Sequence, residues 1–363
     1  MKVVIVLPAL STADAVGHDV LGERACLEEE GIDVAVYAEQ YSRDAAANVN
    51  PDALDFLADG SSLLIYHHAI FWKRGEEILK KAKGKVAVKY HNVTPAHFFL
   101  PYTRHYALFS FLGKRQTAAL ARMNSVLLLA DSSFNAQDFL DEDFPKENVR
   151  IVPPFHRIHN LACAEPDRAM VDTLQQSGEV NLLFVGRVSP NKGHRHLICT
   201  AFHYRLLFGD NIHFYIVGGR DAFLKAYYRE LDALIGRLKL KNCFTFTGKV
   251  SESQLKSYYC GSQAFLCLSE HEGFCVPLLE SQYFKVPIVA YERGAVKETI
   301  GREQLTFEEI DYELLASALH KLSSDAGARE YLTSRGYENF ANYERNRLKE
   351  RFIEAVREVM ELT

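Results

Sequence analysis

Short apolar runs rich in Val, Ile and Leu alternate with amphipathic stretches along almost the whole chain. Such runs are typical of buried strands, and their alternation with helical stretches predicts parallel α/β sheets built from strand–helix–strand units. A first series of strands is predicted at Val3–Leu7, Asp33–Tyr37, Leu63–Tyr66, Val86–Tyr90 and Val126–Ala130, with helices near 17–30, 75–83 and 104–124. A second series is predicted at Asn181–Val185, Ile212–Val217, Cys243–Phe246, Ala264–Leu268 and Pro287–Ala290, and the chain beyond Asp311 is predicted to be helical.

The stretch between the two series contains Pro153 and Pro154 and then loses its periodicity up to about Glu179, which is typical of a linker. A chain of 363 residues, at roughly 150 residues per domain, fits two domains of comparable size. We therefore expect one doubly wound domain over residues 1–160, a second over 161–345, and a C-terminal helix over 346–363 that packs back toward the first domain. Ligands of such sheets bind outside the carboxyl ends of the strands, so a cleft where the two domains face each other is the expected site.

Composition narrows the class of protein. Hydrophobic residues make up 48% and charged residues 25% of the chain, as in a folded globular protein, and the net charge of -5 gives no reason to expect nucleic acid as a partner. The seven cysteines include no C-x-x-C pair, which favours reduced thiols in the cytoplasm over disulfides or a zinc site. The run Val3–Leu10 is interpreted as a first strand and not a signal peptide, and no run approaches the ~20 apolar residues of a membrane span.

The segment Ser269–Glu280 directly follows a predicted strand and contains two glutamates, Glu272 and Glu280. Pro277 suits the first turn of a helix, so Glu272 is placed in the loop and Glu280 about one turn inside the helix. A helix N-terminus attracts phosphate, whereas carboxylates accept hydrogen bonds from sugar hydroxyls. The pattern therefore favours a ligand with a diphosphate between two sugars. The alternative is that Glu272 is a solvated loop residue and Glu280 a helix-surface charge.

A second loop, Gly186–Gly193, follows the strand Asn181–Val185 and contains two cations, Arg187 and Lys192. Arg binds phosphate in a bidentate manner, and Lys acts as a point charge. The alternative is an ordinary solvated basic loop. The glycine turn Gly218–Arg220 is interpreted as a plain connection.

With these motifs the sequence resembles family 4 of the nucleotide-sugar glycosyltransferases, which are retaining enzymes with two Rossmann-like domains in the GT-B arrangement. The resemblance rests on the Gly186-Arg187 and Lys192 segment, on the E-x7-E motif of Glu272 and Glu280, and on Phe246–Ser251. It implies that the first domain faces the acceptor and that the second binds the donor. The implied donor-binding residues are Gly17, Gly186, Arg187, Lys192, Lys249, Val250, Gly273, Phe274, Cys275, Val276 and Glu280.

The resemblance also implies a role for each group. Arg187 and Lys192 would hold the diphosphate, Glu280 the ribose hydroxyls, and Glu272 with the Gly273–Cys275 backbone the transferred sugar. Lys249 and Val250 would lie beside the nucleobase, and helix amides near Val276 would stabilise the leaving group. Cys275 departs from the family, in which glycine is frequent at this position.

In the first half, the resemblance implies that Gly17 lies over the donor phosphates and that His91, after the strand Val86–Tyr90, contacts the donor sugar. His67, His68 and His97 are competing candidates for this role. The implied catalytic set is His91, Arg187, Lys192 and Glu272. The D-x-D sequence Asp141–Asp143 is interpreted as a solvated acidic loop, so neither a metal nor a cofactor is expected.

Residues 71–122 combine basic and aromatic side chains. This combination suits an anionic membrane surface or a lipid diphosphate acceptor. Equally, the aromatics could belong to the core and the lysines to ordinary helix surface. The basic residues are Lys73, Arg74, Lys80, Lys81, Lys83, Lys85, Lys89, Arg104, Lys114, Arg115 and Arg122, and the aromatic groups are Phe71-Trp72, Phe98–Tyr102 and Phe109–Leu112.

The expected function is a retaining, metal-independent glycosyltransferase that moves a hexose, with mannose or glucose favoured, from a nucleoside-diphosphate sugar, with GDP-mannose favoured. The expected acceptor is a lipid-linked or free saccharide in polysaccharide or cell-envelope biosynthesis. The protein is expected in the cytoplasm, at the inner face of the membrane. Two alternatives are a nucleotide-sugar epimerase of the same architecture and a non-catalytic sugar-nucleotide-binding subunit.

Overall fold

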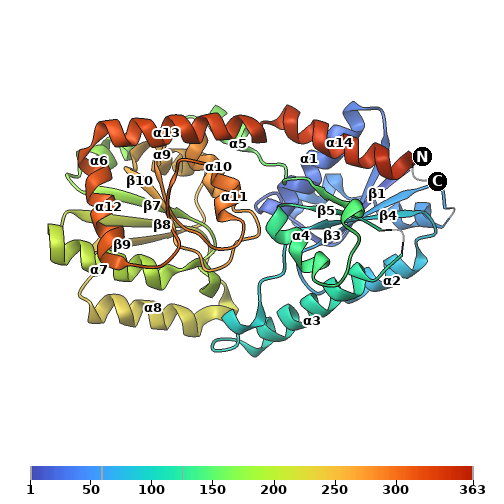
Figure 1. Ribbon diagram of the computed structural model, residues 1–363, viewed down its shortest axis with the longest axis horizontal. Coiled ribbons are helices and arrows are strands. Elements are labelled where there is room, and N and C mark those ends of the chain that lie inside the picture. The colour runs from blue at the N-terminus through green and yellow to red at the C-terminus, as the bar shows by residue number, and fades with distance from the viewer. Residues whose placement is uncertain (1, 59, 125, 362–363) are drawn as a thin grey trace. The chain divides into compact units, whose positions relative to one another are not determined.

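The computed structural model describes residues 2–58, 60–124 and 126–361. The chain divides into two compact units. Unit 1 contains the chain up to Ala96, His105–His156 and the chain from Asn342 onward. Unit 2 contains His97–Arg104 and Arg157–Ala341. In each unit helices flank a parallel sheet (Figure 1).

Unit 1 is built on a parallel sheet with the strand order β2-β1-β3-β4-β5-β6. The central strand β3 is buried at every position, which explains its continuous apolar run, because a parallel sheet is covered on both faces. The strands are β1 (Lys2–Leu10), β2 (Asp33–Tyr41), β3 (Leu63–His68), β4 (Lys85–Tyr90), β5 (Val126–Ala130) and β6 (Val149–Ile151). The helices are α1 (Ala15–Glu29), α2 (Lys73–Lys81), α3 (Arg104–Ala121), α4 (Ser133–Leu140) and α14 (Arg345–Glu361).

Unit 2 is built on a second parallel sheet, with the order β9-β8-β7-β10-β11-β12. The strands are β7 (Val180–Val185), β8 (Ile212–Val217), β9 (Phe244–Gly248), β10 (Ala264–Cys267), β11 (Ile288–Tyr291) and β12 (Leu305–Phe307). The helices are α5 (Ile158–Cys163), α6 (Arg168–Gln176), α7 (His194–Phe208), α8 (Lys225–Arg237), α9 (Glu252–Gly261), α10 (Val276–Tyr283), α11 (Val296–Ile300), α12 (Tyr312–Ser324) and α13 (Ala326–Phe340). The strand order reverses direction between β7 and β10, and ligands of doubly wound sheets bind beside such a switch point.

The predicted fold class, α/β with two doubly wound sheets and a helical C-terminal end, is confirmed. Two strands escaped prediction, β6 and β12, because each is only three residues long. The expected polar linker up to Glu179 contains two helices, α5 and α6. The start of α6 is capped by Asp167, whose carboxylate accepts a hydrogen bond from the Met170 amide.

The division between the units differs from the expected boundaries at three points, one of which is that unit 2 ends at Ala341 and not at 345. The chain passes from unit 1 to unit 2 after His156, four residues before the expected end of the first domain at 160. The segment His97–Arg104 is grouped with unit 2, although it lies in the first half of the sequence. Tyr102 holds it there, because its hydroxyl donates to Glu230 at 2.9 Å and its ring meets Tyr227 edge-on at 5.0 Å.

The C-terminal helix α14 belongs to unit 1, where it lies beside α1 (Figure 1). Its apolar face is buried, and the ring of Phe352 packs edge-on against Phe155. On its polar side Arg345 and Lys349 pair with Glu29 at the end of α1. Helix α14 therefore packs in the same unit as β1, although the two elements lie at opposite ends of the sequence.

Candidate active site

Two loops meet at the switch point of unit 2, one after β7 and one after β10. The Glu270 amide donates to the Asn191 carbonyl at 2.9 Å, and the Asn191 side chain donates to the His271 carbonyl at 3.1 Å. Gly193 ends the first loop with φ +68°, and a Cβ on it would fall 1.8 Å from the Leu268 carbonyl oxygen. Only glycine fits there, so the close approach of the two loops depends on this residue.

Lys192 and Glu272 form an ion pair across these loops. The lysine Nζ lies 2.7 Å from both carboxylate oxygens of Glu272. Glu272 is 5% exposed, so it is not the solvated loop residue of the alternative interpretation. Burial opposes ionisation of Lys192, but the Glu272 carboxylate outweighs it and raises the pKa of the lysine. The structure therefore brings together a fixed cation and a fixed carboxylate that lie 80 positions apart in sequence.

Glu280 lies one turn inside α10, as predicted, and is half-buried. Its carboxylate accepts a hydrogen bond of 2.6 Å from the hydroxyl of Tyr259 on α9. Burial raises the pKa of Glu280, and the Tyr259 hydrogen bond works against that rise. The carboxylate of Glu280 is thus fixed in position by Tyr259, and Glu280 is not a freely solvated charge on the helix surface.

The start of α10 is fixed from several sides. The helix begins at Val276 with Pro277 in its first turn, as predicted. In the loop before it, the Phe274 carbonyl accepts from the Thr299 hydroxyl at 2.7 Å, and the Glu272 carbonyl accepts from the Ala295 amide at 2.9 Å. A helix N-terminus held in this way is a preorganised site for an anion.

The remaining donor-binding candidates of unit 2 follow neighbouring strands. Gly186 and Arg187 come directly after β7, and the side chain of Arg187 is exposed. Lys249 and Val250 come directly after β9; Lys249 is exposed, and Val250 packs against the hydrophobic core. All of these residues follow strands of one sheet at its carboxyl edge.

In unit 1, Gly17 lies in the first turn of α1 and is buried. A Cβ on it would fall 1.7 Å from the Ser11 carbonyl oxygen, so close packing demands glycine here. The amide of Gly17 donates to the Asp14 carboxylate at 2.8 Å. Its N–H is therefore engaged as part of the helix cap and not open toward a phosphate.

His91 follows β4, as predicted, and its side chain is 6% exposed. Its Nδ1 lies 2.9 Å from Asp131 Oδ2, and its Nε2 lies 2.9 Å from Nδ1 of His67. Both ring nitrogens thus have partners inside unit 1. Of the competing histidines, His68 is buried and bonded to Thr117, and the ring of His97 lies at a tilt against that of Phe98 in unit 2.

A buried ionic network surrounds His91, and sequence reasoning did not identify it. Lys89 is fully buried on β4, where its ammonium contacts Asp131, the Val152 carbonyl at 2.5 Å and Asp19 at 3.4 Å. Lys89 is therefore not part of a basic surface, which corrects its place among the membrane-facing cations. The signal was present, because a lysine within the apolar run Val86–Tyr90 must find a counter-ion when the strand is buried on both faces.

The network continues from His67 to Glu23 of α1, whose Oε2 lies 2.9 Å from His67 Nε2. Burial raises the pKa of Glu23 to about 8 and that of Asp19 to about 6. Burial also lowers the pKa of His67 well below its ordinary value. At neutral pH these shifts leave the His67 imidazole uncharged and Glu23 protonated.

The acidic loop Asp141–Asp143 follows α4 and is tied to its own unit. Glu142 pairs with Arg122 at 2.5 Å, and Asp141 accepts from the Gln137 side chain at 2.6 Å. These contacts support the interpretation of an ordinary loop.

The basic and aromatic segment 71–122 is divided among different environments. Trp72 and Phe99 are buried, whereas Leu108 and Phe111 are more than half exposed on the outer face of α3. The basic and aromatic residues of 71–122 therefore do not form a single surface of unit 1, because Phe98–Tyr102 belongs to unit 2 whereas Lys114 and Arg115 belong to unit 1. Within the described part of the chain, no helix is long and apolar enough to cross a membrane.

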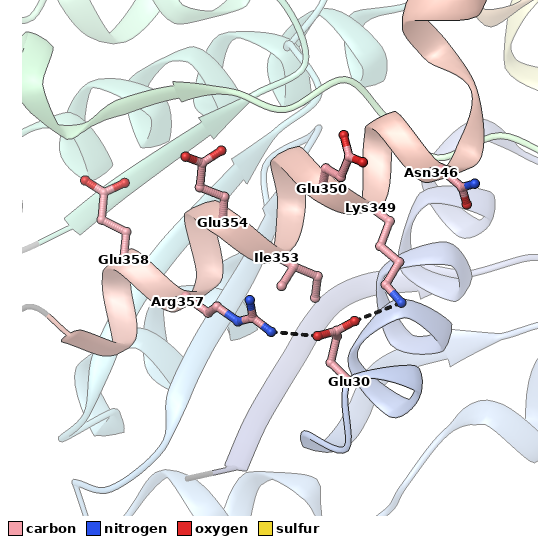
Figure 2. Close-up of a pocket in the computed structure, with 8 residues that line it drawn as sticks. All are labelled: Glu30, Asn346, Lys349, Glu350, Ile353, Glu354, Arg357 and Glu358. Carbon is pink, nitrogen blue, oxygen red and sulfur yellow. Dashed lines mark hydrogen bonds and ion pairs between the residues drawn. The ribbon is translucent and has the colours of Figure 1, made fainter.

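A pocket of about 690 Å³ lies on unit 1, between α14 and the end of α1 (Figure 2). Figure 2 shows Lys349 and Arg357 of α14 reaching toward Glu30, and both donate to its carboxylate, at 2.9 and 2.6 Å. Glu350 and Glu354 also line the pocket. Its cations are already paired and the rest of its lining is largely acidic, so it does not suit a diphosphate.

Residues 167–339 match the family model described as Glycosyl transferases group 1. The match covers both loops of the switch point, the Lys192–Glu272 pair and Glu280. This part of the chain is a glycosyl transferases group 1 domain. The resemblance noted from the motifs is thereby confirmed.

Two curated proteins show which relatives the group 1 domain has. The chain is 22% identical over 180 residues to the "Uncharacterized 41.2 kDa protein in cps region" of Klebsiella pneumoniae, covering 48% of this chain and 44% of that protein. It is 26% identical over 156 residues to the serotype-specific mannosyltransferase WbdA of Escherichia coli, covering 40% of this chain and 18% of that protein. The chain thus spans less than half the length of these curated relatives.

Among solved structures, the chain is similar to Anabaena Alr3699/HepE, crystallised in complex with UDP and glucose. The TM-score is 0.73 at 16% identity, over 99% of this chain and all of that chain. At this identity the likeness shows the fold, which is the GT-B fold that the motifs implied.

Proposed function

We propose that the chain is a retaining, metal-independent glycosyltransferase that moves a hexose from a nucleoside-diphosphate sugar to a lipid-linked or free saccharide. The observation that carries this proposal is the switch point of unit 2. There the Lys192–Glu272 pair, the N-terminus of α10 and the Glu280 carboxylate that Tyr259 holds follow adjacent strands of one sheet. One diphosphate with a sugar on either side matches this set of charges.

Each group has a role in this proposal. Lys192 and the exposed Arg187 neutralise the diphosphate as it leaves, which is electrostatic stabilisation of the transition state. Glu280 accepts from the ribose hydroxyls, and Glu272 positions the transferred sugar. The C1–O bond to the diphosphate breaks while a bond to the acceptor oxygen forms on the same face of the sugar. The proton of the acceptor hydroxyl passes to the departing phosphate.

In this structure the two donor-contact candidates of unit 1 already have partners within their own unit. Gly17 has its amide engaged by Asp14, and both ring nitrogens of His91 are engaged by Asp131 and His67. We propose that His91 reaches the donor sugar only when its bond to His67 is exchanged for one to the ligand. The buried ionic network of Lys89, Asp131 and Asp19 then sets the charge of the His91 imidazole.

Mannose from GDP-mannose is the favoured donor, because WbdA is named a mannosyltransferase. Glucose remains the second candidate, since Alr3699/HepE was crystallised with UDP and glucose. The proposed product is a saccharide for polysaccharide or cell-envelope assembly, and the proposed place of the reaction is the inner face of the membrane. The mannosyltransferase name of WbdA supports the saccharide product alone.

A donor panel tests the proposal. The protein is incubated with GDP-mannose, UDP-glucose and ADP-glucose, with and without a panel of saccharide acceptors, and products are followed by mass and anomeric NMR signals. Acceptor-dependent nucleotide release with retained configuration supports transfer. A sugar altered without acceptor would instead show the epimerase, and binding without turnover would show the non-catalytic subunit.

A further inference from the structure

Two cysteines of unit 2 lie side by side within the donor loop. Cys267 is the last residue of β10, and Cys275 directly precedes α10. Their Sγ atoms are 3.9 Å apart. One carboxylate oxygen of Glu272 completes a group of three potential ligand atoms that all lie within 4.8 Å of one another. Cys267 and Glu272 are buried, so this group is held in place by the core.

The spacing of the sulfurs fits one bound ion. A tetrahedral zinc ion with Zn–S bonds of about 2.3 Å holds two thiolates roughly 3.8 Å apart. Two thiolates with one carboxylate form a soft donor set, which selects zinc-like ions over Mg²⁺ or Ca²⁺. The fourth position would be left to water.

The backbone conformation of Cys275 is a second observation that favours a functional role for its thiol. Cys275 has φ +73° and ψ +71°, in the left-handed region that disfavours every residue with a side chain. Glycine would relieve this strain. Strained residues cluster at active sites and ligand clamps, so a cysteine retained in this conformation is a candidate ligand.

We propose that a thiophilic divalent cation of the zinc class binds to Cys267, Cys275 and Glu272. Both S–H bonds break, the two protons pass to solvent, and no electron is transferred. The net charge of the site does not change, because one dication replaces two protons beside the Lys192–Glu272 pair. Because thiolates and not thiols are the metal ligands, binding releases these protons and depends on pH.

A bound ion alters the donor site. Lys192 contacts both carboxylate oxygens of Glu272, and the ion requires one of them. The ion therefore loosens the contact by which Glu272 positions Lys192, the cation that we assign to the diphosphate, and it is expected to inhibit nucleotide binding. This expected inhibition rests on the proposed function, whereas the binding of the ion does not.

Cobalt(II) titration of the reduced, metal-free protein tests the binding. Thiolate-to-cobalt charge-transfer absorption in the near ultraviolet is expected to saturate at one equivalent, with release of two protons, and to disappear when Zn²⁺ is added. Cys275→Gly should bind more than ~100-fold more weakly, beyond the 10–100-fold typical of losing only an outer partner. This variant is expected to fold, because glycine suits the backbone there.

The matched controls are Cys163→Ser and Cys260→Ser, which replace exposed cysteines and should bind like wild type. An absent charge-transfer band, an unchanged band in Cys275→Gly, or a mass showing that the pair has oxidised to a disulfide would each overturn the metal site. Nucleotide binding with and without Zn²⁺ separates the two proposals. Metal binding that leaves nucleotide affinity unchanged overturns the inhibition alone.

Discussion

The Lys192–Glu272 pair is the residue-level feature on which the proposed chemistry depends most. If Lys192 stabilises the leaving diphosphate, Lys192→Ala should lower kcat by ~10²-fold or more. The variant also leaves the buried carboxylate of Glu272 unpaired, so its unfolding midpoint must be measured alongside. Lys225→Ala, at an exposed position in the same unit, is the control. Unchanged turnover with a verified donor would remove Lys192 from the catalytic set.

Glu23 should make the stability of unit 1 depend on pH. Its pKa rises from 4.5 to about 8 on folding, so its contribution is fully present below pH 4.5 and is lost as the pH rises through about 8. The change amounts to a few kcal/mol, at about 1.4 kcal/mol per pKa unit. In Glu23→Gln this fall should vanish, because the amide imitates the protonated acid. Urea unfolding of both proteins at pH 5 to 8.5 measures it.

His67 works in the opposite direction in the same range, since its lowered pKa favours the folded state as the pH rises. The difference between wild type and Glu23→Gln, and not the absolute curve, is therefore the diagnostic quantity. Parallel curves for the two proteins would mean that Glu23 is ionised in the folded state.

At the scale of elements, the approach of the β7 and β10 loops depends on Gly193. Gly193→Ala should destabilise the protein by more than the ~1–3 kcal/mol of backbone strain alone, because the new Cβ meets the Leu268 carbonyl. Gly178→Ala is a matched control with φ +73° and no atom within 4 Å of the new Cβ. Equal losses of unfolding free energy in the two variants would show that the loops can separate without cost.

The outer face of α3 is the element that could attach the protein to a membrane. Leu108, Phe111 and Arg115 are exposed and follow one another at helical spacing. Phe111→Ser/Arg115→Glu should reduce co-sedimentation with anionic vesicles at low salt, since each basic residue near such a surface contributes about 1 kcal/mol. Lys81→Glu, on the exposed side of α2, is the control. If wild type itself stays in the supernatant, the membrane role of α3 is wrong.

At the scale of the whole molecule, the chain crosses between its units more than once, and α14 returns to unit 1. Phe352 on α14 is fully buried against the core of that unit. Phe352→Ala should cost ~3–5 kcal/mol and lower the stability of unit 1 selectively. Hydrogen exchange resolved by peptide would show faster exchange in β1–β6 and unchanged exchange in β7–β12. Arg347→Ala, on the exposed side of the same helix, should change neither.

The sequence by itself determined the two series of strands apart from the short β6 and β12, the helix with Pro277 in its first turn, and the loop position of Glu272. These features are local, since each follows from the period of apolar residues or from a proline at a helix start. The family match of residues 167–339 agrees with the motifs for the same reason. Motifs such as E-x7-E are short and contiguous, so they can be recognised from one sequence without a structure.

Only the tertiary structure decided which distant groups meet. The bond between Glu23 and His67 joins residues 44 positions apart, and it exists because α1 packs against β1, the neighbour of β3 in the sheet. Likewise the grouping of His97–Arg104 with unit 2 depends on Tyr102 meeting Tyr227 and Glu230. Periodicity reports which face of an element is buried, but it does not report what lies opposite. The apolar run around Lys89 indicates that this lysine is buried, but only the strand order, which places β5 beside β4, brings the carboxylate of Asp131 to it.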